Sequence, residues 1–138
     1  MLKCSGRRFA FEIPVEWWVA AGMLSFAADR PHYRAAPPDN PDHATIILPI
    51  DTIDVRPRGA RVPLFDKDRM IRVLKFIRLD HAMEPIHVFD EASGEGHAHV
   101  LSHGYHLLAA SIAVGFTQVP AVTGMRTLDE IKRAENMT

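Results

Sequence analysis

Four histidines and a glycine lie close together in the sequence. His97, His99, His103 and His106 fall within ten residues, and Gly104 stands between the last two. Imidazole is the side chain whose ordinary pKa lies nearest neutrality, and in its neutral form it is a common ligand of zinc and other transition metals. The group therefore permits two kinds of chemistry: a hydrogen bond or proton transfer to an anion, and metal binding.

The residues around Gly104 predict a strand that runs through a glycine directly into a helix. The N-terminus of a helix presents unpaired N–H groups and partial positive charge, which suit an anion such as phosphate. A glycine there lets a ligand approach the backbone closely. The candidate residues for such an anion site are Ser102, His103, Gly104, Tyr105 and His106. His106 lies in the first helical turn, where it can donate to a phosphate oxygen or act as an acid or base.

Metal binding is the alternative use of the histidines. His97, His99 and His103 have the same parity on an extended strand, so they can face one side of it, and His106 follows within one helical turn. Imidazoles at this spacing can bind Zn, Ni or Fe, and His87 on the neighbouring strand can join them. The other interpretation is that these residues are ordinary surface histidines or bind backbone groups.

The histidines begin a long segment without charge. No Asp, Glu, Lys or Arg occurs from His97 to Met125, although charged residues make up 24% of the chain. Polar residues, glycines and a proline interrupt this run, so it predicts a buried helix and strand rather than a membrane span. Residues 105–114 are apolar on nearly all sides and predict a buried helix that ends at Gly115. Residues 119–123 predict the strand that follows.

The preceding elements follow from hydrophobic periodicity. Residues 65–79 predict an amphipathic helix whose buried face holds Met70, Val73, Leu74 and Ile77, with Asp66 as N-cap. The remaining predicted elements are strands over 8–13, 44–49, 85–89 and 97–101, an extended segment over 50–58, helices over 15–28 and 128–135, and a hairpin turn over 91–96.

Length and charge narrow the class of protein. The 138 residues suit one domain, which at this size needs no disulfide or metal to fold. Lys and Arg number 16 against 17 Asp and Glu, so bulk attraction to nucleic acid or to an anionic membrane is not expected. The single cysteine, Cys4, cannot form an internal disulfide, and the N-terminus lacks the apolar region of a signal peptide. We expect a soluble cytoplasmic protein.

The segment Phe65–Val122 resembles the ParB/sulfiredoxin superfamily, and the match is longer if Ile46 to Arg61 is included. The resemblance rests on five motifs in the same order: an Ile-x-x-Ile-like strand (Ile50 to Ile53), a Val-Leu-x-x-Ile helix (Val73, Leu74, Ile77), a Pro-Ile-x-Val strand (Pro85, Ile86, Val88), a Gly-x-His helix start (Gly104, His106) and a Gly-x-x-x-Val-Pro-Ala segment (Gly115 to Ala121).

The resemblance implies a fold and a ligand. The fold is an α+β domain, with a small mixed β-sheet and packed helices over 44–138, after a strand–helix segment and a proline-rich connection over 1–43, in one compact unit. The ligand is a nucleotide, ATP or CTP with Mg²⁺, or another small anion. Its phosphates are bound at the junction around Gly104, and the basic residues that can add charge are Arg69, Arg72 and Arg58.

Three departures from the family pattern bear on activity. Leu107 stands where the family has Arg, and leucine cannot bind a phosphate. His103 replaces an Asp, and Tyr105 replaces the sulfiredoxin nucleophile Cys, which disfavours sulfiredoxin activity and leaves no catalytic residue assigned. The alternative function is a non-catalytic interaction module, related to protein–protein contacts or DNA partition, with a protein partner or a second copy of the chain. No helix-turn-helix domain follows, so strong direct binding to nucleic acid is not expected.

Overall fold

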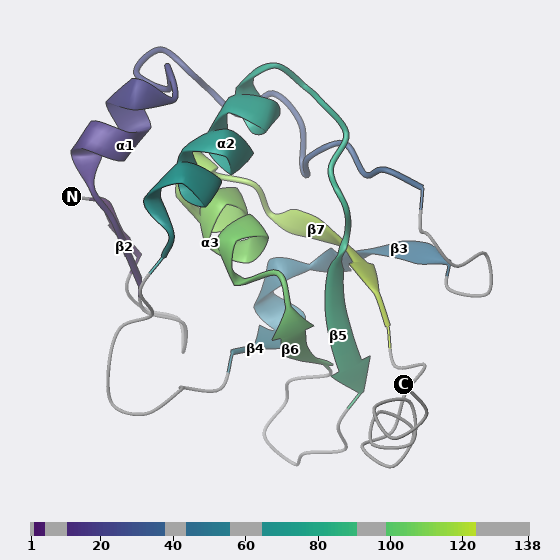
Figure 1. Ribbon diagram of the computed structural model, residues 1–138. Helices are drawn as coiled ribbons and strands as arrows, with labels where there is room; N and C mark the ends of the chain where they lie inside the picture. Colours follow the sequence, from purple (N-terminus) through teal and green to yellow (C-terminus); the bar gives the residue numbers. More distant parts are fainter. Residues whose placement is uncertain (1, 5–10, 38–43, 56–64, 91–98, 124–138) are drawn as a thin grey trace, which may run out of the picture.

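A five-stranded mixed sheet forms the centre of the fold (Figure 1). The computed structural model describes residues 2–4, 11–37, 44–55, 65–90 and 99–123. The strand order is β3-β7-β5-β6-β4, in which β3–β7 and β5–β6 are antiparallel and β4–β6 and β5–β7 are parallel. The strands are β3 (Thr45–Pro49), β4 (Ile53–Asp54), β5 (Ile86–Asp90), β6 (His99–His103) and β7 (Gln118–Val122). The α+β class with a small mixed sheet is therefore confirmed.

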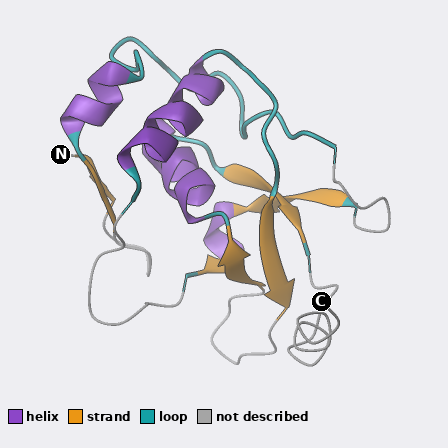
Figure 2. Cartoon of the chain, in the orientation of Figure 1, coloured by secondary structure: helices purple, strands orange, loops and turns teal. Residues whose placement is uncertain are grey.

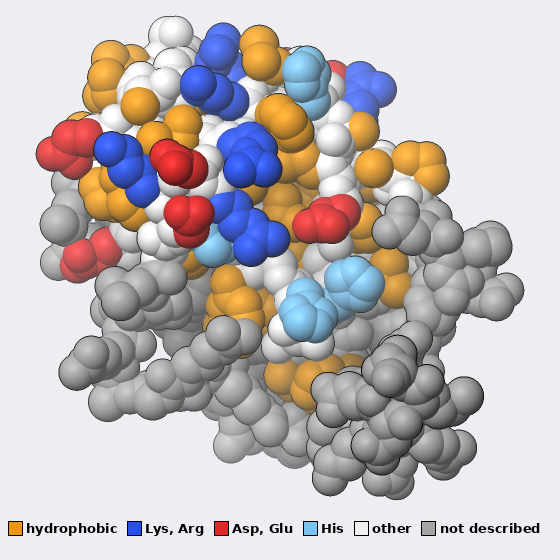
Figure 3. Space-filling view, in the orientation of Figure 1, with side chains coloured by type: hydrophobic (Ala, Val, Ile, Leu, Met, Phe, Trp, Pro, Cys, Tyr) orange, Lys and Arg blue, Asp and Glu red, His pale blue; other side chains and the backbone are white. Residues whose placement is uncertain are grey.

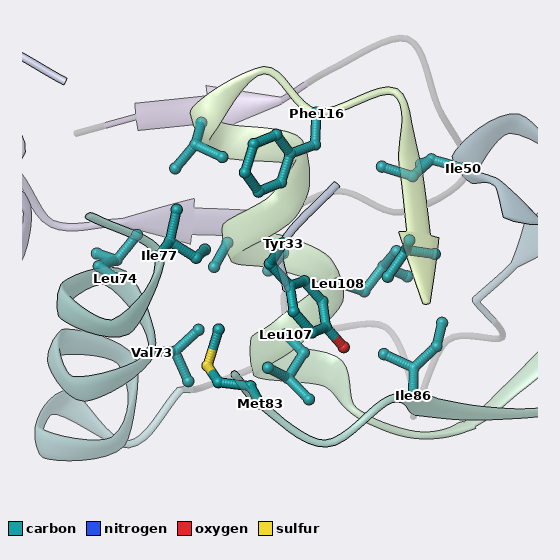
Figure 4. Close-up of a cluster of buried hydrophobic side chains, with 14 of the residues drawn as sticks. Tyr33, Ile50, Val73, Leu74, Ile77, Met83, Ile86, Leu107, Leu108 and Phe116 are labelled. Carbon is teal, nitrogen blue, oxygen red and sulfur yellow. The ribbon is translucent and has the colours of Figure 1, made fainter. Parts of the chain in front are cut away.

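The helices pack on this sheet in layers (Figures 1 and 4). Helix α3 (Tyr105–Val114) lies between the sheet and α2 (Lys67–Arg78). Leu108 points from α3 toward Ile86 of the sheet, whereas Leu107 points toward Val73 and Met83 (Figure 4). Burial on both sides explains why α3 is apolar nearly all round, as its sequence predicts. The helix has the predicted bounds, and Gly115 ends it at a positive φ of 97°.

Helix α2 is the amphipathic helix that the periodicity predicts. Its four predicted core residues, Met70, Val73, Leu74 and Ile77, are all buried. Asp66 occupies the N-cap position, as predicted, but its side chain makes no capping hydrogen bond. The charged residues of α2 are all exposed, outside the buried face.

The N-terminal helix is shorter than its sequence predicts. Helix α1 (Val15–Ala20) ends eight residues before the predicted position, Ala28. The chain turns at Gly22, whose φ is +77°, and the Nε of Arg78 donates a hydrogen bond to the carbonyl of Ala21 (2.9 Å). A Cβ on Gly22 would lie 2.9 Å from that same Nε. The Gly22 N–H donates to the carbonyl of Val19 (2.9 Å) and the Met23 N–H to that of Trp18 (3.1 Å), so α1 ends in a Schellman motif with Gly22 as its C′ glycine. The predicted helix to Ala28 overlooked this local stop signal, and Arg78 of α2 packs on the turn.

Other predictions are confirmed or corrected element by element (Figure 2). Strands β3, β5 and β7 lie within one residue of their predicted bounds, and β2 (Phe11–Ile13) falls within the predicted strand and pairs with β1 (Leu2–Cys4). The predicted extended segment is wrong over the 3-10 turn η1 (Ile50–Thr52), where Thr52 Oγ1 donates to the carbonyl of Pro49 (2.7 Å). The predicted turn over 91–96 and helix over 128–135 lie outside the described residues.

The segment before the sheet contributes to the same hydrophobic core. Phe11, Ile13 and Tyr33 are buried in it, and the Tyr33 hydroxyl donates to the carbonyl of Glu84 (2.7 Å). Both tryptophans, Trp17 and Trp18 of α1, are half-buried against this core. Asp80 accepts hydrogen bonds from Arg30 and Arg34 just beyond the end of α2. The bond from Arg34 is the main reason that the pKa of Asp80 lies below its ordinary value.

Helices of membrane-spanning length and apolarity are absent from the part of the chain that the structure describes.

Candidate functional site

Gly104 joins β6 to α3 in a conformation that other residues rarely adopt. Its φ is +109°, and a Cβ at this position would lie 2.6 Å from Cγ2 and 2.9 Å from Cβ of Ile86. The glycine therefore satisfies two requirements, a left-handed backbone and direct contact with β5. Because Gly104 has no side chain, the N-terminus of α3 can lie directly against the sheet. The unpaired N–H groups of the first turn of α3 follow immediately after it.

His106 connects the N-termini of α2 and α3. The backbone N–H of Asp66 donates a hydrogen bond to the Nε2 of His106 (3.0 Å), across 40 residues of sequence. The His106 ring also packs edge-on against Phe65, with ring centroids 5.1 Å apart. Since Asp66 is the N-cap of α2 and Gly104 the N-cap of α3, this contact brings two positive helix ends to one place.

The environment of His106 keeps its imidazole neutral. Partial burial is the main cause that lowers its pKa, and the positive charge of Arg69 lowers it further, while Asp66 acts in the opposite direction. A ring nitrogen that accepts a hydrogen bond carries no proton, so the acceptor role of Nε2 assigns the remaining proton to Nδ1. His106 is therefore a neutral donor through Nδ1, and Nε2 is engaged in the protein.

This assignment makes stability depend on pH. The pKa of a histidine in an unfolded chain is about 6.5. The pKa of His106 is lower in the folded protein, so the unfolded chain binds the proton first as the pH falls. The contribution of neutral His106 to the free energy of unfolding is therefore complete above about pH 6.5, the unfolded pKa. It is lost as the pH falls through the folded pKa. We expect H106Q, whose side-chain oxygen can still accept from Asp66, to lose less free energy of unfolding than the parent protein between pH 7.5 and 5.5.

Urea unfolding at the two pH values measures this difference. The control is H81Q, at an exposed histidine beyond the C-terminal end of α2, which should keep the pH dependence of the parent. An H106Q protein whose stability falls with pH as steeply as the parent's would show that His106 does not supply this dependence.

The structure places two of the three predicted basic residues on α2. Arg69 and Arg72 are exposed on α2, and Arg69 is near enough to lower the pKa of His106. Figure 3 shows Lys and Arg side chains over α2 with Asp and Glu side chains between them, on the same face of the molecule as a pair of His side chains near β5 and β6. Arg58 lies outside the described residues. The surface around the joined helix ends thus carries positive charge from at least one of the predicted residues.

The remaining residues of the junction differ in burial. Ser102 and Tyr105 are half-buried, and His103 is exposed. Leu107, where the family has Arg, is only 6% exposed and packs inside the core (Figure 4). The side chain at that position points away from solvent, so the junction has no cation there.

The histidines do not form the single face that their parity predicts. A β-bulge shifts the register between His87 and Val88, so that His103 lies opposite His87 whereas Leu101 lies opposite Val88. Ser102 has no residue of β5 opposite it in the register, and the alternation of side chains between the two faces reverses at this point. His99, opposite Asp90, is consequently on the other face of the sheet from His103. The predicted common face is therefore wrong for these two residues.

The described histidines separate into distinct groups. His87 and His103 lie side by side with ring centroids 6.0 Å apart, and His106 is turned toward α2. Within the described ranges, no group of three or more His, Cys, Asp or Glu side chains is placed to hold a metal ion. His97 lies outside these ranges. The structure thus brings together His87 with His103, and His106 with Arg69, but it does not bring His99, His103 and His106 together.

Sequence reasoning missed the partners of the predicted residues. Phe65 and Asp66 were expected only at the start of a helix, yet both contact His106. Nothing in the local sequence connects them, because the contact depends on how α2 and α3 pack. The pairing of His87 with His103 had a weak signal, namely two histidines on strands joined by a predicted hairpin.

Comparisons with known proteins bear on the fold. No protein-family model matches the chain, and no curated protein matches it. Among solved structures, it is similar to sulfiredoxin from Arabidopsis thaliana, with a TM-score of 0.51 and 17% identity over 65% of this chain and 94% of that one. It is also similar to the C-terminally truncated chromosome-partitioning protein ParB from Caulobacter crescentus, complexed with CTP-γ-S, with a TM-score of 0.50 and 19% identity over 67% of this chain.

The extent of these similarities differs. The matched region spans 52% of the ParB chain, about half its length. At such identities the similarity concerns the arrangement of the backbone, and it agrees with the element order and motifs that the sequence presents from Ile50 to Ala121. The chain has a ParB/sulfiredoxin-like fold.

Proposed function

We propose that this protein binds a nucleotide, or another ligand with phosphate groups, where the N-termini of α2 and α3 meet. The observation that carries the proposal is the hydrogen bond from the Asp66 N–H to His106, which joins the two helix ends beside Arg69. The function is binding, and no catalytic step is part of it.

The electrostatics of the joined helix ends favour an anion. Each helix N-terminus carries the equivalent of roughly half a positive charge and unpaired N–H donors. Two such ends add to the full charge of Arg69, and the Nδ1–H of His106 is one further donor. The exposed carboxylates of Asp66 and Asp68 at the start of α2 offset part of this positive charge, so the backbone N–H groups and Arg69 provide the attraction. The chain as a whole has a net charge of −1, so the attraction is local rather than general.

The class of ligand follows from the fold and from the missing cation. The similar ParB structure was complexed with CTP-γ-S, which supports a nucleoside triphosphate, CTP or ATP with Mg²⁺, over a simple anion. Leu107 lies in the core where the family has Arg, so one phosphate contact is absent. We therefore expect weaker binding than a site with that Arg would give, and no phosphoryl transfer.

Titration calorimetry with CTP, ATP, ADP and inorganic phosphate, each with Mg²⁺, tests the proposal. A charged hydrogen bond contributes about 1.5–3 kcal/mol, so R69Q should weaken nucleotide binding at least about tenfold. The matched control is K75Q, which removes an exposed cation six residues further along the same helix and should bind as the parent does.

Two results would contradict this function. The first is the absence of heat for every nucleotide at high protein concentration, which would favour the interaction module instead. The second is equal weakening in R69Q and K75Q, because a diffuse attraction to the basic face of α2 would then explain the binding.

A further inference from the structure

The structure pairs two exposed histidines on adjacent strands beside the helix junction. His87 of β5 and His103 of β6 are direct partners in the antiparallel register, and both side chains are exposed. Their ring centroids are 6.0 Å apart and their planes are nearly perpendicular, at 84°. From this geometry we infer that His87 and His103 form a binding site for one transition-metal ion of the zinc, cobalt, nickel or copper(II) class.

The distance between the rings suits a shared metal ion. Imidazole nitrogens bind zinc at about 2.0–2.1 Å, and in a tetrahedral site this places the two ring centroids roughly 5 Å apart. The observed 6.0 Å differs from that value by an amount that side-chain rotation can supply. Directly opposed residues of antiparallel strands have Cβ atoms about 4.5–5.5 Å apart, so the backbone already holds both ligands in place.

The β-bulge is what creates this pair. Without the shift between His87 and Val88, Leu101 would share the exposed face of His103, since residues two apart on a regular strand point the same way. With it, Leu101 is buried opposite Val88 while His103 stays at the surface opposite His87. Bulges of this kind commonly occur where a strand must aim a side chain at a site.

Two protein ligands determine the kind of metal site. Imidazole is a borderline ligand that favours zinc, cobalt, nickel and copper(II) over Mg²⁺ or Ca²⁺. A site with two protein nitrogens leaves the other coordination positions to water or to an oxygen of a bound ligand. His103 is followed directly by Gly104, so the ion would lie beside the start of α3. This inference does not depend on nucleotide binding.

Calorimetric titration of tag-free protein with ZnCl₂, and with CoCl₂ followed by visible absorption, tests the site. We expect one ion per chain. Loss of an outer-shell partner alone weakens metal sites about 10–100-fold, so removal of a ligand in H87Q or H103Q should cost at least that factor. Both residues are exposed, and circular dichroism should show that the variants remain folded.

The matched control is H81Q, which removes an exposed histidine from elsewhere on the surface and should leave the affinity unchanged. A titration of the parent protein with no bound zinc or cobalt would overturn the inference. So would unchanged affinity in both H87Q and H103Q, or a loss in H81Q equal to theirs. A nucleotide titration without transition metal separates this outcome from that of the proposed function.

Discussion

Replacement of Gly104 by alanine is expected to destabilise the protein by about 3 kcal/mol. Two costs combine: a left-handed φ of +109° in a residue with a side chain, about 1–2 kcal/mol, and overpacking against Ile86, about 1–3 kcal/mol. Neither can be relieved easily, because the nearest atoms include the Cβ and backbone Cα of Ile86 as well as its methyl group. Urea unfolding monitored by circular dichroism measures the loss.

Gly115 provides the matched control for this effect. Its φ of +97° is similarly left-handed, but among the residues that the structure describes a Cβ there would meet only Ala28, at an ordinary 3.9 Å. G115A should therefore pay the backbone cost alone, about 1 kcal/mol. If the two substitutions proved equally destabilising, the close contact between Gly104 and β5 would not be the reason for the glycine at the junction.

Restoring the arginine of the family pattern is expected to damage the fold rather than the ligand affinity alone. Leu107 is 6% exposed and lies between α2 and α3, where Val73 and Met83 surround it (Figure 4). An arginine there places a charge among the apolar side chains of the core. We expect L107R to lose about 3–5 kcal/mol of unfolding free energy.

The control for this substitution keeps the volume and the apolar character. L107M should cost less than about 1.5 kcal/mol in the same urea experiment, because methionine fits irregular apolar spaces. An L107R protein as stable as the parent that also bound CTP more tightly would show that this side chain reaches the site. In that case the junction would lack the arginine itself but would keep a backbone position from which an arginine can reach the ligand.

Prediction from sequence worked best where a local pattern decides the structure. The periodic spacing of Met70, Val73, Leu74 and Ile77 identified α2 and its buried face, and the uniform apolarity of residues 105–114 identified α3 with its glycine ends. The motif order from Ile50 to Ala121 pointed to the fold that the structural comparisons support. In each case the signal lies within one helix or strand, or in the order of the elements.

The candidate site shows where such reasoning stops. Its members Gly104, His106 and Arg69 were identified as candidates from sequence, but their relation was not. The contact between His106 and Asp66 spans 40 residues and exists only because α2 and α3 pack with their N-termini together. Likewise, Leu107 could be recognised as a departure from the pattern, but only packing shows that its side chain is directed into the core.

The sequence alone therefore determined the identity of the helices, most of the strands and the glycine junction, because side-chain periodicity and backbone preference act over a few residues. Tertiary structure decided the contact between the N-termini of α2 and α3 and the division of the described histidines into separate groups. One unpaired residue, Ser102, reverses the alternation along β6 and sets His103 with His87 instead of His99. Strand register and the meeting of helix ends depend on contacts between distant segments, and no local pattern encodes them.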